Sequence, residues 1–353
     1  MKRKVTRQIS VGSVKIGGGA PISVQSMTNT DTRDPEATID QIRRLESVGC
    51  DIVRVAVPDM EAAEKVGQIK KGINLPLIAD VHFDYRLALR AIEEGVDGLR
   101  INPGNIGGKA KVRALVEAAR ERGISLRIGV NSGSIDKKLL RKYGHPTPEA
   151  MLESALNHIE MLESLDFSDI KVSLKASNVT DTIDAYRLIS ERIDYPLHVG
   201  ITEAGTSFAG AIKSAVCIGV LLDEGIGDTI RVSLTADPAE EVRAGYEILK
   251  ALGLRQRGVN IISCPTCGRC EIDLINLAND VERRLAHITV PLNIAIMGCV
   301  VNGPGEAKEA DIGIAGGKGE GLLFKKGRAV KKVKEGELAD VFVREVEGMV
   351  RSL

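Results

Sequence analysis

A strand–turn–helix pattern repeats eight times between Ile22 and about Lys250. Each repeat begins with a short apolar run rich in β-branched residues, passes through a polar turn, and continues with apolar positions every three to four residues. The predicted strands are Ile22–Ser26, Ile52–Val57, Leu75–Ala79, Gly98–Ile101, Leu126–Val130, Ile170–Leu174, Leu197–Ile201 and Thr229–Leu234. The clearest predicted helices between them are Pro35–Val48, Arg86–Glu94, Ala110–Arg122, Pro148–Ser164 and Pro238–Leu252.

Eight strand–helix units of this size are typical of a (β/α)8 barrel, which usually takes about 250 residues. A doubly wound open sheet is the alternative, because periodicity alone does not show that a sheet closes. The count of eight favours the barrel. We therefore expect an α/β protein with a TIM-type barrel over residues 1–255.

The alternation of strands and helices changes after Gly253. The predicted strands there are Val259–Ser263, Leu292–Met297, Asp311–Ala315 and Gly321–Lys325, and the predicted helices are Glu271–His287 and Glu337–Ser352. No helix follows the glycine-rich segment 316–321, so we interpret this segment as a hairpin turn and not as a nucleotide-binding loop. These elements predict a small α+β domain over residues 256–353.

Four of the six cysteines fall in this second domain. Cys264, Cys267 and Cys270 are spaced two residues apart between a predicted strand and a helix, and Cys299 ends the next strand. Such thiolates reach one metal centre, and the set fits a structural zinc site with four sulfur ligands. A Cys-x-x-Cys-x-x-Cys run is also the opening of a ferredoxin-type ligand set. The spacing alone leaves zinc and iron–sulfur open.

Composition narrows the class of protein. Six cysteines in 353 residues are too few for a disulfide scaffold, and clustered thiols in a reducing compartment bind metal or do redox chemistry. Basic and acidic residues balance at 48 each, and only 3% of residues are aromatic, which argues against nucleic-acid binding. No apolar run approaches the roughly 20 residues that span a bilayer. We expect a cytoplasmic protein that binds neither nucleic acid nor membrane.

Polar side chains follow the ends of the predicted barrel strands, where the active site of such a barrel lies. They are Thr28, Asn29, Arg54, Asp80, His82, Arg100, Asn102, Arg127, Asn131, Lys175, Glu203, Arg231 and Ser233. Cations on successive strands repel one another unless an anion lies between them, so the set predicts a phosphate-rich substrate. For any single side chain, an ion pair within the barrel wall is the alternative. His82 and Glu203 are the candidates for acid–base chemistry.

Five motifs are specific enough to compare with known proteins: Val24–Thr30, Ala79–Phe83, Arg100–Gly107, Ile262–Arg269 and Met297–Glu306. In this order they resemble the bacterial hydroxymethylbutenyl diphosphate synthase family over essentially the whole chain. The resemblance implies a four-iron four-sulfur cluster held by three cysteines and a glutamate. Carried onto this sequence, these ligands are Cys264, Cys267, Cys299 and Glu306, which leaves Cys270 outside the set.

The resemblance also implies a reaction. The family opens methylerythritol cyclodiphosphate and removes a hydroxyl as water to give hydroxymethylbutenyl diphosphate, in the methylerythritol phosphate route to isoprenoids. Two electrons come from reduced flavodoxin or ferredoxin, in keeping with the absence of a flavin or nicotinamide fingerprint in the sequence. An exchangeable carboxylate at Glu306 would free an iron to act as a Lewis acid, while Arg54, Arg100, Arg127 and Lys175 would hold the diphosphate.

The family further implies a head-to-tail homodimer in which one subunit's cluster domain covers the partner's barrel mouth. The competing hypothesis is a non-redox barrel lyase or phosphate-binding protein with a structural zinc domain. Glu306 discriminates between them, because a zinc ribbon needs no carboxylate at that position. We interpret the basic run from Lys325 to Lys334 as a solvated edge and not as a docking surface.

Overall fold

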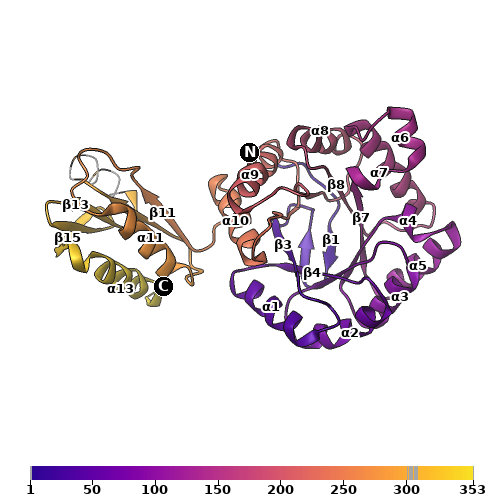
Figure 1. The fold of residues 1–353 in the computed structure, drawn as a ribbon, viewed down its shortest axis with the longest axis horizontal. Coiled ribbons are helices and arrows are strands. Elements are labelled where there is room, and N and C mark those ends of the chain that lie inside the picture. Colours follow the sequence, from indigo (N-terminus) through magenta and orange to yellow (C-terminus); the bar gives the residue numbers. More distant parts are fainter. Residues whose placement is uncertain (1, 300, 302–304, 306–308, 353) are drawn as a thin grey trace. The chain divides into compact units, whose positions relative to one another are not determined.

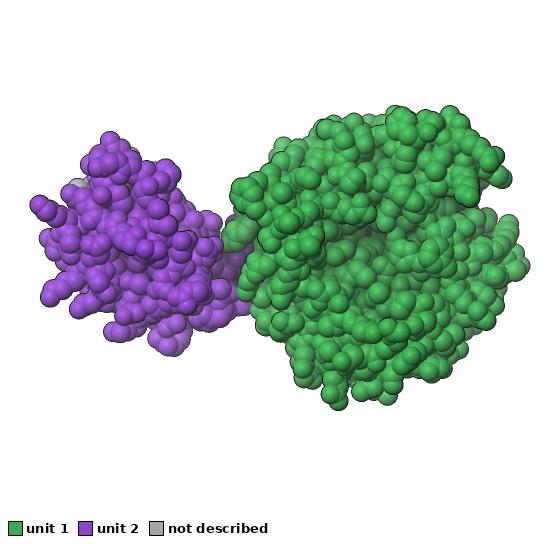
Figure 2. Space-filling view, viewed as in Figure 1, with its two compact units in different colours: residues 1–255 green, residues 256–353 purple. Residues whose placement is uncertain are grey.

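The computed structural model describes residues 2–299, 301, 305 and 309–352. The chain forms two compact units, Met1–Arg255 and Gln256–Leu353 (Figure 2). No helix in these described stretches is long and apolar enough to cross a membrane.

Unit 1 is a barrel of parallel strands (Figure 1). The strands are β3 (Ser23–Met27), β4 (Ile52–Ala56), β5 (Leu77–Asp80), β6 (Gly98–Ile101), β7 (Ser125–Asn131), β8 (Ile170–Lys175), β9 (His198–Val199) and β10 (Thr229–Ile230). They pair in the order β8-β7-β6-β5-β4-β3-β10-β9. A parallel bridge from Val172 of β8 to Leu197, next to β9, joins the two ends of this order. The sheet is therefore nearly closed, which confirms the barrel and excludes the open doubly wound sheet.

Helices follow the strands and surround the barrel (Figure 1). They are α1 (Pro35–Ser47), α2 (Met60–Lys71), α3 (Tyr85–Glu93), α4 (Pro103–Ile106), α5 (Lys109–Glu121), α6 (Lys137–Tyr143), α7 (Pro148–Glu163), α8 (Val179–Ser190), α9 (Ser207–Asp223) and α10 (Pro238–Ala251). Side-chain caps fix many of the starts; the Asp34 carboxylate, for example, accepts a hydrogen bond from the Ala37 N–H. These caps set where each loop ends and its helix begins. They therefore help to position the loop residues at the barrel mouth.

A short hairpin that the apolar pattern did not predict closes the amino-terminal end of the barrel. It consists of β1 (Ile9–Val11) and β2 (Val14–Ile16), and Gly12 turns it at a φ of 54°. Ile9, Val11 and Ile16 pack against Ile52 and Ile78 in one apolar cluster. This plug seals the bottom of the barrel with apolar side chains.

Unit 2 is a five-stranded mixed sheet with two helices on one face. The strands are β11 (Val259–Ser263), β12 (Leu292–Met297), β13 (Ile312–Gly317), β14 (Glu320–Lys325) and β15 (Arg328–Lys334), and the helices are α11 (Leu274–Leu285) and α13 (Leu338–Arg351). The strands β11, β12 and β13 are parallel, and β14 and β15 continue the sheet antiparallel. The predicted hairpin turn lies between β13 and β14, as expected. The basic run forms the unpredicted edge strand β15, whose exposed lysines are typical of edges that resist pairing.

Replacing Ile16 with alanine tests the role of the plug. Ile16 is fully buried, so the loss of its side chain should lower the free energy of unfolding by about 2–5 kcal/mol through lost burial and the cavity that remains. The measurement is the midpoint of denaturant unfolding, followed by circular dichroism. Val5→Ala, at a position that is 80% exposed, is the control and should change stability by less than about 0.5 kcal/mol. Equal effects of the two substitutions would show that the hairpin does not seal the barrel.

Candidate active site in the barrel and cysteine site in unit 2

The register of the sheet places charged side chains inside the barrel. Asp80, Arg100, Arg127 and Lys171 are direct partners across the neighbouring strands β5 to β8. Because side chains alternate along a strand, direct partners face the same side of the sheet. Their neighbours along the strands, such as Leu126, Ile128 and Val172, belong to the apolar core shared with the helices, so the four charged side chains face the barrel interior. Branched apolar residues usually fill this space in such barrels. A charged interior therefore indicates a binding site.

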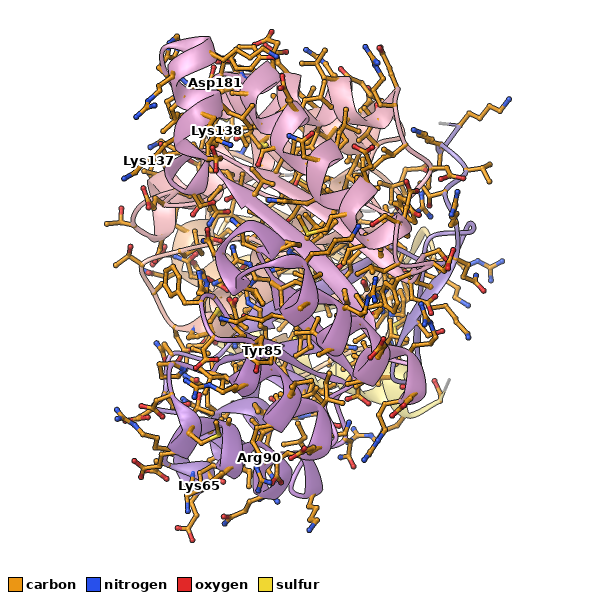
Figure 3. All side chains as sticks on the ribbon, turned by 90° about the vertical axis from the view of Figure 1, so that its right-hand side faces the viewer. Lys65, Tyr85, Arg90, Lys137, Lys138 and Asp181 are labelled. Carbon is orange, nitrogen blue, oxygen red and sulfur yellow. The ribbon has the colours of Figure 1, made fainter. Side chains whose placement is uncertain are left out.

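The mouth of the barrel is a hollow on the face shown in Figure 2. Figure 3 shows the molecule from the side and labels Tyr85 at the start of α3, Lys137 at the start of α6 and Asp181 in the first turn of α8. Helices begin just past the carboxyl ends of strands in this fold, so the starts of these helices lie on the side of the mouth.

Asp80 is the centre of the charged set. Its carboxylate pairs with Arg54 Nε at 3.4 Å, with Arg100 Nη1 at 3.1 Å and with His82 Nε2 at 3.2 Å. Burial by itself would raise the pKa of Asp80, but Arg54, the His82 hydrogen bond and Arg100 together hold that pKa well below its usual range. Asp80 is therefore an ionised anchor that fixes two guanidinium groups at the mouth.

Arg127 and Lys175 are further cationic groups in the interior. Arg127 is 2% exposed, and its Nε and Nη1 atoms have no hydrogen-bond partner among the residues that the structure describes. Burial lowers the pKa of Arg127 well below its usual value, as does repulsion by Arg54 and Arg100. Burial and repulsion by Arg231 and Arg127 do the same to the pKa of Lys175. Buried donors with excess positive charge fit an anionic ligand.

Arg231 lies after β10 and is paired with a residue that the sequence did not single out. Glu241 of α10 is buried and accepts from Arg231 Nη2 at 3.2 Å, from Ser26 Oγ at 2.9 Å and from the Leu234 N–H at 3.0 Å. Nothing in the sequence pattern marks Glu241, because it lies on a helix and not at a strand end. It holds the Arg231 guanidinium and the loop that carries Ser233.

Several predicted residues serve the loops around the mouth. Asn102 caps α4 by accepting the Gly104 N–H at 3.2 Å, and the Asn29 side chain accepts from Gln41 Nε2 at 2.6 Å. The backbone N–H of Asn131 donates to Ser134 Oγ at 3.1 Å. In contrast, the Thr28 hydroxyl is buried with no partner in the described part of the chain.

Glu203 is exposed and lies in the loop after β9, where its φ of 54° is in the left-handed region. A non-glycine residue there is strained, and such strain gathers at functional loops. The acid–base candidate Glu203 is therefore presented on a constrained loop.

Sequence reasoning also missed three interior residues: Gln25, Lys171 and His198. All three are fully buried. The signal that reveals Lys171 is the alternation Lys171-x-Ser173-x-Lys175, since Lys175 was recognised only because it ends the strand. His198 lies at the start of β9, whereas the predicted site residues were sought at the carboxyl ends of the strands.

The cysteine site lies at one edge of the sheet of unit 2. Cys264 comes directly after β11, and one residue, Gly298, separates Cys299 from the end of β12. Because the two strands are parallel and in register from Val259–Leu292 to Ser263–Ile296, their carboxyl ends meet. The Gly298 N–H donates to Cys264 Sγ at 3.5 Å. Cys267 is exposed on a loop that Thr266 turns with a φ of 65°.

Cys270 is engaged differently from Cys264 and Cys267. Its thiol donates to the Ile272 carbonyl at 3.3 Å and packs so closely on Gly298 that any side chain on Gly298 would overlap it. Among the described residues no three His, Cys, Asp or Glu side chains lie close enough to hold a metal ion, and Glu306 lies outside the described residues. The donors still fit an iron–sulfur group chemically, because thiolates are its ligands and a backbone N–H donates to one of them.

Comparison with known proteins bears out the predicted family. Residues 6–246 match the GcpE TIM-barrel domain, and residues 260–348 match the GcpE protein C-terminal domain. The 4-hydroxy-3-methylbut-2-en-1-yl diphosphate synthase (flavodoxin) of Geobacter sulfurreducens is 65% identical over 347 residues and covers 98% of both chains. The enzyme of the same name from Symbiobacterium thermophilum is 62% identical over 347 residues, which is 98% of this chain and 94% of that protein.

The matches among solved structures are much more distant. The Yersinia pestis dihydropteroate synthase covers 70% of this chain and 98% of its own with 13% identity and a TM-score of 0.49, which is too distant to bear on function. The two family matches, in contrast, extend over both units. The chain belongs to the GcpE family of 4-hydroxy-3-methylbut-2-en-1-yl diphosphate synthases.

Proposed function

We propose that this chain converts 2-C-methyl-D-erythritol 2,4-cyclodiphosphate to 4-hydroxy-3-methylbut-2-enyl diphosphate, with reduced flavodoxin as the electron donor. The names of relatives at 65% and 62% identity give this product and flavodoxin. The observation that carries the proposal is Arg127, a buried guanidinium with unpaired N–H groups among other buried cations. A cyclic diphosphate supplies the negative charge and the oxygen acceptors that these groups lack. Family membership leaves the non-redox zinc alternative without support.

The reaction consumes two electrons and one proton. The bond between a ring carbon and its phosphate oxygen breaks, the neighbouring hydroxyl takes a proton and leaves as water, and the two electrons remain in the new carbon–carbon double bond. When bound, a [4Fe–4S] cluster supplies single electrons and a Lewis-acidic iron. The chain itself must hold the diphosphate, exclude water and deliver the proton.

The barrel residues divide these tasks. Arg54 and Arg100 are fixed by Asp80, so they meet the diphosphate without reorganisation, and Arg127 and Lys175 bind it from inside the barrel. Thr28, Asn29, Asn102, Asn131, Arg231 and Ser233 complete the substrate site. His82, half-exposed and hydrogen-bonded to Asp80, and Glu203, on its strained loop, are placed to bring a proton to the departing hydroxyl.

The cluster ligands in this proposal are Cys264, Cys267, Cys299 and Glu306. Cys264 and Cys299 are supported by the meeting of their strand ends. Cys270 is left out because its thiol is already bonded to a backbone carbonyl and packed on Gly298. The enzyme acts in the cytoplasm as a head-to-tail homodimer, in which unit 2 of one subunit covers the barrel mouth of its partner. That arrangement accounts for the location of the anion site and the cysteines on separate units.

Two cysteine variants test the ligand set. Anaerobic reconstitution with iron and sulfide should give broad visible absorption and about four irons per chain. Cys299→Ser should lose both the absorption and the turnover, because a thiolate ligand is gone. Cys270→Ser, the matched control, should keep most of both. The opposite pattern, or a colourless protein that holds one zinc, would contradict the proposal.

Arg127→Met tests the anion site directly. Loss of two or more hydrogen bonds to a charged group should reduce kcat/KM for the cyclodiphosphate by roughly a hundredfold or more. Steady-state kinetics with the reconstituted enzyme measures this. Arg113→Met, which removes an exposed guanidinium from α5, should be silent. Comparable losses in the two variants would mean that Arg127 does not contact substrate.

A further inference from the structure

A second layer of buried polar groups lies below the mouth of the barrel. Lys171 of β8 is directly opposite Arg127 of β7 and is fully buried. Its Nζ has no hydrogen-bond partner in the part of the chain that the structure describes. Like charges directly opposite on neighbouring strands are destabilising, and an unpaired ammonium in the interior is costly. The burial of an unpaired lysine at this position therefore indicates a role other than stabilising the fold.

His198 belongs to the same layer. It is fully buried at the start of β9, its Nδ1 is 3.4 Å from Thr229 Oγ1, and its Nε2 has no partner among the described residues. Burial lowers the pKa of His198 well below its usual value, as do Lys175, Arg127 and Lys171. Both side-chain amide atoms of Gln25 are also buried without described partners. The layer thus holds several groups that are ready to bond to one small ligand.

The position of the layer suggests a floor beneath the mouth. Lys171 is four residues before Lys175 on β8, which corresponds to about 13 Å along a strand. Further down, Ile52 and Ile78 belong to the apolar plug. Arg127 and Arg54 lie close enough to Lys171 to lower its pKa by repulsion, in addition to the effect of burial. Lys171 therefore shares the barrel interior with Arg127, its direct partner on β7.

Charge favours an oxyanion over water in this space. Lysine and arginine side chains only donate hydrogen bonds, so water satisfies their donors but leaves their charges uncompensated in a region of low dielectric. A phosphate group offers several acceptor oxygens and negative charge at once. Asp80 does not fill this role, because its carboxylate is already shared by Arg54, Arg100 and His82.

We propose that Lys171 and His198 form the floor of the anion site, and that Lys171 Nζ donates a hydrogen bond to an oxygen of the substrate's most deeply buried phosphate group. The substrate then enters phosphate first, with its carbon atoms toward the mouth. The identity of the substrate rests on the proposed function. The floor itself is a site for phosphate oxyanions in general.

Titration calorimetry with inorganic pyrophosphate, on the cluster-loaded full chain without oxygen, tests this floor. Lys171→Met should raise the Kd about tenfold to a hundredfold, as expected for one hydrogen bond to a charged group. Lys171→Gln, which keeps a donor without the charge, should lie between Met and the unaltered protein and serves if the Met variant does not fold. Lys71→Met is the charge-matched control, because Lys71 is exposed in the last turn of α2, at the helix end away from the mouth, and should leave the Kd unchanged.

Steady-state kinetics gives a second readout. Lys171→Met should raise KM for the cyclodiphosphate more than it lowers kcat, because the floor binds the phosphate and does not touch the reacting carbons. Pyrophosphate binding as tight in Lys171→Met and Lys171→Gln as in the unaltered protein would overturn the proposal and indicate a water-filled floor. A protein that binds pyrophosphate through Lys171 but never converts the cyclodiphosphate would refute the proposed function and leave the floor standing.

Discussion

Repulsion among buried positive charges is the constraint that governs the interior of the barrel. Arg54, Arg100, Arg127, Lys171 and Lys175 are all nearly or fully buried, and Asp80 is the carboxylate that several of them share. The cost appears in the pKa of Arg54, which burial and repulsion by Arg231 and Arg100 lower to about 10 despite its ion pair with Asp80. A structure that keeps such an interior is less stable than one with an apolar core, and a bound anion offsets much of the difference.

The rest of the fold makes this charged interior possible. The plug of the β1–β2 hairpin closes the bottom of the barrel, and the apolar core lies outside the strands, between sheet and helices. Among the described residues, two buried carboxylates lie beside these cations: Asp80 pairs with Arg54 and Arg100, and Glu241 pairs with Arg231. The barrel therefore presents preformed positive charge inside its strands, which is the form of preorganisation that a doubly charged substrate requires.

The sequence predicted the fold well where patterns were long. The predicted Gly98–Ile101 is β6 to the residue, and Pro148–Ser164 differs from α7 only at its last residue. The prediction was too long for Thr229–Leu234, because only Thr229 and Ile230 pair before the chain turns toward Arg231. The hairpin and β15 were missed because three-residue strands and lysine-rich edges give no clear apolar alternation.

The site was predictable only in part. Residues at strand ends could be found because barrel topology brings those ends together, whereas Lys171 and His198 lie at strand starts and Glu241 on a helix. The contact of Cys270 with Gly298 could not follow from cysteine spacing, since it depends on how the loop folds back on β12. Spacing shows which thiols are near in sequence, but it does not show which of them already donate a hydrogen bond to the backbone, as Cys270 does.

Counting electrons against product tests the central claim most directly. The reconstituted enzyme, supplied anaerobically with cyclodiphosphate and with reduced flavodoxin in limiting amount, should form one hydroxymethylbutenyl diphosphate for every two electrons delivered. Formation of product without consumption of electrons, or oxidation of flavodoxin with the cyclodiphosphate recovered intact, would contradict the account.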